Sequence, residues 1–134
     1  MASIRREVTI DVPAEKAWDA LRDVGALDRR LARGFVARVD MGEDVGVRVV
    51  TFANGMVARE RIIDVDDVAR RVAWSAEIGR LTHYSASAQV FTDGPTRCRF
   101  VWIADLLPHD AAPAVTAMIE AGLAATKKTL EADR

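Results

Sequence analysis

The chain has 134 residues, 50% of them hydrophobic, and its 19 Lys and Arg side chains nearly balance 20 Asp and Glu, which gives a net charge of -1. This length suits one domain over residues 1–134 that can bury a sizeable core. The charges are spread without long runs, so neither nucleic acid nor an anionic membrane surface is an expected partner.

Cysteine and histidine usage indicates the compartment and excludes several kinds of site. Cys98 is the one cysteine, which rules out an internal disulfide and fits a reducing compartment. His83 and His109 lie far apart, and no Cys or carboxylate stands at metal-ligand spacing, so we expect no metal. No phosphate-binding glycine loop or nucleophile motif is present, so we expect no cofactor. No apolar run suits a membrane span or signal peptide, and we expect a cytoplasmic protein.

The first 40 residues predict the order strand, helix, helix, strand. Residues 4–11 alternate apolar and polar side chains, as in a half-buried strand, with Arg6 as the one charged residue on its inner face. An apolar stripe at helical spacing over 13–23, with proline in its first turn, predicts a helix. A second short helix over 26–32 and a strand over 35–40 complete this part.

The next 70 residues read as five further strands separated by turns. The strongest local signal is Asn54-Gly55 between β-rich runs over 47–53 and 56–65, because both residues tolerate the positive φ of a tight two-residue hairpin turn. The remaining strands are expected over 71–78, 81–91 and 97–106.

The last stretch, 110–134, predicts a single long amphipathic helix. Pro108 ends the preceding strand and Asp110 can cap the first exposed amides. At about 1.5 Å per residue this helix is more than about 30 Å long and needs a broad partner. We therefore predict an α+β fold in which a seven-stranded curved antiparallel sheet wraps around the long C-terminal helix, with two short helices between strands one and two.

Strand periodicity predicts a cavity between this sheet and the final helix. The inner face carries many alanines and faces Gly122 on the helix, and small residues there either admit a close approach or leave a void. A void with aromatic walls and a few polar groups matches a small-molecule pocket. The candidate ligand-binding residues are Met56, Glu60, Trp74, Tyr84, Ala86, Trp102, Met118 and Gly122.

Glu60 and Tyr84 are the residues in this set whose side chains could take part in a reaction or bind a polar group of the ligand. Glu60 shares its strand face with apolar neighbours, and burying an unpaired carboxylate is costly. It could anchor a polar group of the ligand, act as a general base, or form a structural pair with an arginine near the barrel mouth. Tyr84 could donate its hydroxyl to a bound carbonyl, or be a core tyrosine.

Several motifs stand in an order that resembles the helix-grip superfamily, which includes START lipid-binding domains, the birch-pollen-allergen fold and the polyketide cyclase/dehydrase and lipid-transport family. They are residues 12–18, 46–48, 59–64, 70–74, 81–84 and 96–102, followed by the long helix. The resemblance covers essentially the whole chain. Glu60 and Tyr84 also look like pocket residues of plant abscisic-acid receptors, but the 52–56 turn lacks the receptor gate, so hormone sensing is not expected.

The resemblance implies binding or transport of a hydrophobic or aromatic small molecule, lipid or polyketide-like, in the internal cavity. The alternative is a polyketide cyclase/dehydratase-type enzyme with Glu60 as general base and Tyr84 as proton donor. A third possibility is a vestigial cavity in a protein whose surface serves a partner. Fold alone does not decide among them. The oligomeric state stays open.

Overall fold

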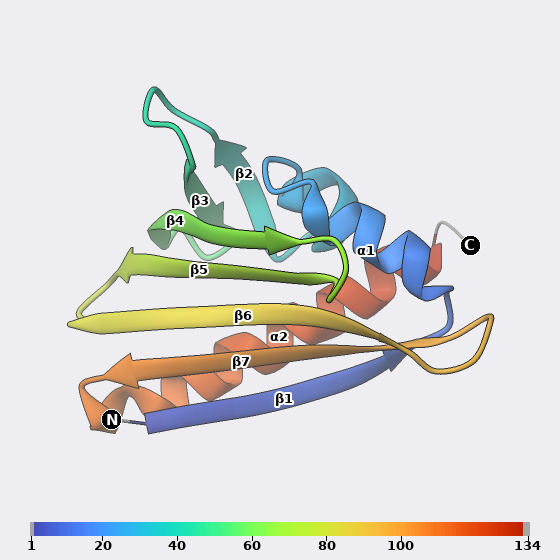
Figure 1. The fold of residues 1–134 in the computed structure, drawn as a ribbon. Helices are drawn as coiled ribbons and strands as arrows, with labels where there is room; N and C mark the ends of the chain where they lie inside the picture. Colours follow the sequence, from blue (N-terminus) through green and yellow to red (C-terminus); the bar gives the residue numbers. More distant parts are fainter. Residues whose placement is uncertain (1, 133–134) are drawn as a thin grey trace.

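Seven antiparallel strands curve around one long helix in the computed structural model, which describes residues 2–132 (Figure 1). The elements in chain order are β1 (Ala2–Ile10), α1 (Ala14–Arg22), the π-helical turn η1 (Leu27–Leu31), β2 (Val36–Asp40), β3 (Val47–Phe52), β4 (Val57–Asp66), β5 (Arg71–Ile78), β6 (His83–Thr92), β7 (Cys98–Leu107), the 3-10 turn η2 (His109–Ala111) and α2 (Ala112–Ala132). The sheet order is β1-β7-β6-β5-β4-β3-β2. The predicted α+β fold is confirmed, with strand ends shifted by one or two residues.

Helix α2 crosses the concave face of the sheet, and its buried side of Val115, Ile119, Leu123 and Leu130 packs into the core (Figure 1). The charged residue on the inner face of β1 finds its partner on this helix. Arg6 Nε donates to Glu120 Oε1 at 3.3 Å, and both side chains remain about half exposed. Such a pair contributes about 0–1 kcal/mol, so it satisfies the charge more than it stabilises the sheet edge.

The start of the long helix differs from the prediction. Strand β7 runs to Leu107, a cis peptide bond joins it to Pro108, and η2 precedes α2. Asp110 therefore lies inside a 3-10 turn, where Ala111 N–H donates to Pro108 O at 3.1 Å, and not at the position before the helix. The predicted cap is wrong, and the last two residues of the predicted helix, 133–134, lie outside the described residues.

The β3–β4 turn also differs. Phe52 N–H donates to Met56 O at 2.8 Å, so the loop has three residues instead of the predicted two. Gly55 takes the positive φ of 89°, whereas Asn54 does not and instead accepts Met56 N–H on its side-chain oxygen at 3.0 Å. A three-residue hairpin loop with glycine in the left-handed position is a common alternative to the two-residue turn.

This extra loop residue sets which side chains face each other across β3 and β4. The observed register places Arg48 directly opposite Glu60. A two-residue loop at Asn54-Gly55 would have paired Glu60 with Val49, whose side chain points to the other face of β3. The three-residue loop therefore brings Arg48 and Glu60 together as the ion pair described in the next section.

One end of the space between sheet and α2 is closed by the helical segment after β1. Helix α1 packs on β5, β6 and β7, while η1 contacts β2 and α2. Trp18 Nε1 donates to Asp67 Oδ1 at 3.0 Å and Arg22 Nε to the same atom at 2.9 Å, which ties α1 to the β4–β5 loop. At this end α1 and η1 cover the space between the sheet and α2. An open pocket lies beside the β5–β6 loop and the start of α2.

Candidate functional site

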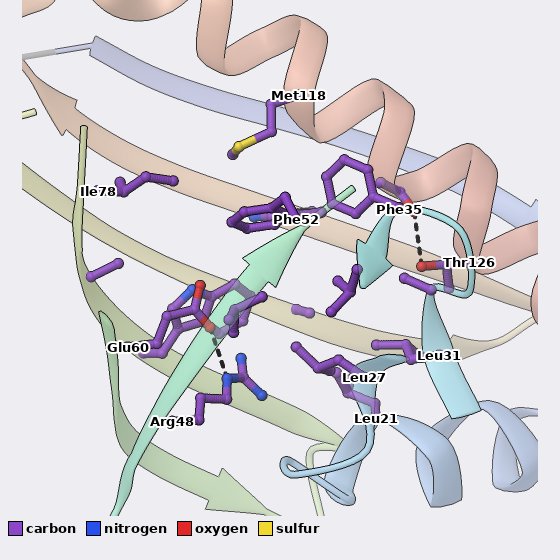
Figure 2. Close-up of a pocket in the computed structure, with 18 of the residues that line it drawn as sticks. Leu21, Leu27, Leu31, Phe35, Arg48, Phe52, Glu60, Ile78, Met118 and Thr126 are labelled. Carbon is purple, nitrogen blue, oxygen red and sulfur yellow. Dashed lines mark hydrogen bonds and ion pairs between the residues drawn. The ribbon is translucent and has the colours of Figure 1, made fainter. Parts of the chain in front are cut away.

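An inner chamber of about 60 Å³ lies between the concave face of the sheet, α2 and the α1–η1 segment (Figure 2). Its apolar wall on the closed side is made by Leu21, Leu27 and Leu31. Strands β2 to β7 supply most of the rest, together with Ala32 and Phe35 before β2 and with Met118, Gly122 and Thr126 of α2. A single water needs about 10–15 Å³ of such space, so the chamber holds a few waters or a small chemical group.

A larger and open space, here called the vestibule, adjoins the chamber and has a volume of about 970 Å³. On the α2 side it is lined by the small residues Ala114, Ala117 and Ala121. Its remaining rim includes Asn54, Met56, Arg80, Leu81 and Pro108. The vestibule therefore lies beside the β3–β4 turn, the β5–β6 loop and the start of α2.

Four side chains line both spaces: Phe35, Phe52, Ile78 and Met118, called the boundary residues below (Figure 2). The rings of Phe35 and Phe52 meet edge to face with centroids 5.3 Å apart. Phe35 precedes β2 and Phe52 ends β3, while Met118 comes from α2. A molecule that enters the chamber from the vestibule must pass these apolar groups.

A buried ion pair lies at the wall of the chamber. Arg48 Nε donates to Glu60 Oε1 at 2.7 Å, and their side chains are 3% and 9% exposed. Arg48 Nη1 also donates to Val24 O at 3.0 Å, and the guanidinium carbon lies 5.5 Å from the centre of the Trp74 ring. Burial raises the pKa of Glu60, and the charge and hydrogen bond of Arg48 offset part of that rise.

Three buried polar atoms that face this region have no hydrogen-bond partner among the described residues: Trp74 Nε1, Tyr84 Oη and Trp102 Nε1. Burial raises the pKa of the Tyr84 hydroxyl, the nearby Trp102 indole lowers it, and the Glu60 carboxylate raises it. The Trp102 indole N–H therefore lies close enough to the Tyr84 hydroxyl to act on its pKa as a hydrogen-bond donor would, although neither atom has a partner that meets the usual hydrogen-bond distance and angles. Buried polar atoms are paired in most proteins, which makes this cluster unusual.

The alanines of β6 explain how two tryptophans fit on the concave face. Trp74 of β5 stands opposite Ala86, and Trp102 of β7 stands opposite Ala88. The two rings therefore lie on either side of β6 with centroids 6.0 Å apart and a tilt of 60°. Of the two predicted outcomes, close approach or a void, these small residues give close approach of the indole rings, which occupy much of the concave face.

Gly122 has a packing reason to be glycine. A Cβ atom at this position would lie 2.7 Å from Trp102 Cζ3 and 3.1 Å from Phe35 Cε2. Both distances are shorter than ordinary contacts, so the missing side chain lets two aromatic rings rest against the backbone of α2. Thr126 Oγ1 donates to Gly122 O at 2.9 Å on the same face of the helix (Figure 2).

The candidate ligand-binding residues are distributed unequally. The chamber brings together Glu60, Trp74, Tyr84, Trp102, Met118 and Gly122. Met56 lies in the vestibule with 44% of its surface exposed, and Ala86 is buried on the concave face without lining either space. The predicted alternative of a pair between Glu60 and an arginine is confirmed, but sequence reasoning did not identify Arg48 as the partner. Its place two residues before Val50 puts Arg48 on the inner face of β3.

Two further searches of the described part of the chain gave no site. Within residues 2–132, no three His, Cys, Asp or Glu side chains group so as to hold a metal ion. No helix in this range is long and apolar enough to cross a membrane.

Comparisons with known proteins agree on the fold. The family model described as "Polyketide cyclase / dehydrase and lipid transport" matches residues 1–131. Similar solved structures include XoxI from Bacillus cereus (19% identity, 100% of this chain and 99% of that chain, TM-score 0.86). Also similar is the ZhuI aromatase/cyclase from Streptomyces sp. R1128, with 19% identity over 98% of this chain and 92% of that chain and a TM-score of 0.75. A START superfamily protein from Mycobacterium smegmatis has 12% identity over 98% of this chain and 95% of that chain and a TM-score of 0.74. No curated protein matches in sequence.

Proposed function

Because this chain belongs to the polyketide cyclase/dehydrase and lipid-transport family, we propose that it binds a hydrophobic or aromatic small molecule, lipid or polyketide-like, between the sheet and α2. The observation that carries the proposal is the pair of adjoining spaces that share four lining residues, an inner chamber with buried polar groups and an open, mostly apolar vestibule. Ligand sites are typically apolar hollows in which a few polar groups fix orientation.

The lining supports an apolar ligand. Apolar side chains form most of both walls, and the charged pair of Arg48 and Glu60 neutralises itself within the chamber. A strongly charged ligand would have to be desolvated without a countercharge of its own there. The vestibule's volume falls within the range of about 300–1,000 Å³ that small-molecule sites occupy, whereas the chamber alone is below it.

The proposal can be tested by titrating the protein with 1-dodecanol and with 2-naphthol while recording ¹H–¹⁵N NMR spectra. We expect saturable shifts of the Ala88 and Gly122 amides, which belong to the chamber wall. Ala88→Leu fills the chamber and should reduce the shifts, whereas Ala73→Leu on the outward face of β5 should not. Absence of saturable shifts with both compounds would favour a vestigial cavity and contradict the proposal.

A second candidate function is polyketide cyclase/dehydratase-type catalysis, favoured by the presence of Glu60 and Tyr84 in one chamber. Glu60 would remove a proton from the carbon beside a ketone, and the resulting enolate would attack a second carbonyl of the same molecule. Tyr84 would donate a hydrogen bond to the new alkoxide, which recovers the proton from Glu60 and gives a hydroxyketone. The raised pKa of Glu60 suits a general base.

Binding and catalysis separate in one variant. Glu60→Gln preserves the size of the side chain and removes the base, so a catalytic role predicts ligand affinity within about tenfold of wild type and loss of turnover. If the wild type shows no turnover and Glu60→Gln loses ligand binding, catalysis is excluded and the carrier function is retained.

A further inference from the structure

The unpaired polar atoms of the inner chamber are all groups that donate hydrogen bonds. The indole N–H of Trp74 and that of Trp102 can only donate, and a tyrosine hydroxyl with a raised pKa keeps its proton at neutral pH. Trp74 and Tyr84 are 6% and 4% exposed, so bulk water does not serve them. A buried donor without a partner costs about 1–3 kcal/mol, which a suitable acceptor would recover.

No acceptor of the chamber wall reaches these donors, because none of the three atoms has a hydrogen-bond partner among the described residues. Glu60 Oε1 already accepts from Arg48, and Thr126 Oγ1 is turned to the backbone carbonyl of Gly122. Carbon atoms make up most of the remaining wall. The missing acceptors must therefore come from a molecule in the chamber, either a few waters or a group of the ligand.

The size of the chamber limits that group. At about 60 Å³ it admits a small polar head, whereas the vestibule of about 970 Å³ has room for a large apolar body. The boundary residues line both spaces, so the two spaces meet at these side chains. The unpaired polar atoms lie on the chamber side of them and the larger apolar space on the other.

As a deepening of the proposed function, on which this inference rests, we infer that the ligand carries a neutral hydrogen-bond acceptor, such as a ketone or ester carbonyl. That acceptor enters the chamber first and receives hydrogen bonds from Trp74, Tyr84 and Trp102, while the apolar body stays in the vestibule. A protonated amine has no lone pair to offer these donors and is disfavoured at this end. A pure hydrocarbon leaves the donors unpaired and binds more weakly than its size suggests.

A matched pair of probes tests the inference: 2-acetylnaphthalene, which has a ketone, and 2-isopropylnaphthalene, which has the same shape without it. Dissociation constants are measured by tryptophan fluorescence for the wild type and for Tyr84→Phe, which keeps the ring and removes one donor. We expect Tyr84→Phe to weaken the ketone by up to about tenfold and to leave the hydrocarbon unchanged, since one hydrogen bond is lost in the first case alone.

Two more variants extend the test. Trp102→Phe should again weaken the ketone more than the hydrocarbon, although the smaller ring also alters packing. Trp18→Phe is the matched control, because the Trp18 indole donates to Asp67 outside the chamber. It should change neither affinity once circular dichroism shows that the variant is folded.

The outcomes separate this inference from the proposed function. If both probes bind the wild type and the Tyr84→Phe and Trp102→Phe variants change both affinities by the same factor, or neither, the acceptor inference is overturned and the proposed function stands. If neither probe binds the wild type, the binding of aromatic ligands is contradicted and the inference fails with it.

Discussion

Arg48 and Glu60 form a 2.7 Å hydrogen-bonded ion pair that is almost entirely removed from solvent at the wall of the inner chamber. The pair exists because a three-residue loop joins β3 and β4 and aligns the two residues across the hairpin. Its charges neutralise each other, so a polar wall can face an apolar hollow at a tolerable cost in desolvation.

Removing one member of this pair should destabilise the fold strongly. Arg48→Met leaves Glu60 buried without its partner, and we expect a loss of about 3–5 kcal/mol in the free energy of unfolding, measured in urea at pH 7. The double variant Arg48→Met with Glu60→Leu removes both charges and should recover most of that loss. If the double variant is as unstable as the single one, the pair is not the source of the effect.

The raised pKa of Glu60 gives stability a definite pH dependence. Because the folded carboxyl has a higher pKa than the ordinary value of 4.5, the folded state holds its proton more tightly than the unfolded state. The resulting stabilisation is full below pH 4.5 and is lost as pH rises through the folded pKa. The unfolding free energy of the wild type minus that of Glu60→Gln should therefore fall as pH rises. A difference that increases with pH would contradict the raised pKa of Glu60.

Gly122 should resist the substitution that usually strengthens a helix. Glycine to alanine inside a helix normally gains about 1 kcal/mol, but here the new Cβ meets Trp102 at 2.7 Å. We expect Gly122→Ala to cost about 1–3 kcal/mol and to change the tryptophan emission. The neighbouring exposed Ala121→Gly should lose only the propensity difference of about 1 kcal/mol. A stabilised Gly122→Ala protein would show that Trp102 moves aside without cost.

The boundary residues should control how fast a ligand enters. Phe52→Ala removes one of the two rings that meet between vestibule and chamber, so the association rate of 2-acetylnaphthalene in stopped-flow fluorescence should increase several-fold. Phe91→Ala is the control, because that ring lies under Arg99 away from both spaces and should leave the rate unchanged. Equal rates in all three proteins would mean that entry does not pass Phe52.

Much of this fold could be predicted because its signals are local and repeated. Strand alternation identified the seven strands and the inner faces of β5, β6 and β7, where Trp74, Tyr84 and Trp102 are indeed turned toward α2. The family resemblance is also confirmed by the match over residues 1–131. Periodicity sufficed here because charged or polar residues mark the outward side of these three strands.

Periodicity could not identify which residue pairs with Glu60 or how side chains fill the concave face of the sheet. The partner of Glu60 follows from loop length, and Asn54-Gly55 is compatible with loops of two or three residues. The filling of the space by indole rings follows from Ala86 and Ala88 lying beside Trp74 and Trp102 across three strands. Predicting that arrangement requires the register in which β5, β6 and β7 pair, which the sequence pattern of each strand does not give.

The most direct test is native mass spectrometry of the protein purified gently from its own host, compared with its denatured mass. We expect a reproducible added mass that is lost on denaturation, retained in Ala73→Leu and absent in Ala88→Leu, whose side chain fills the chamber. A bare mass in the wild type, repeated after incubation with a library of lipids and aromatic ketones, would contradict the central claim that this hollow binds an apolar molecule.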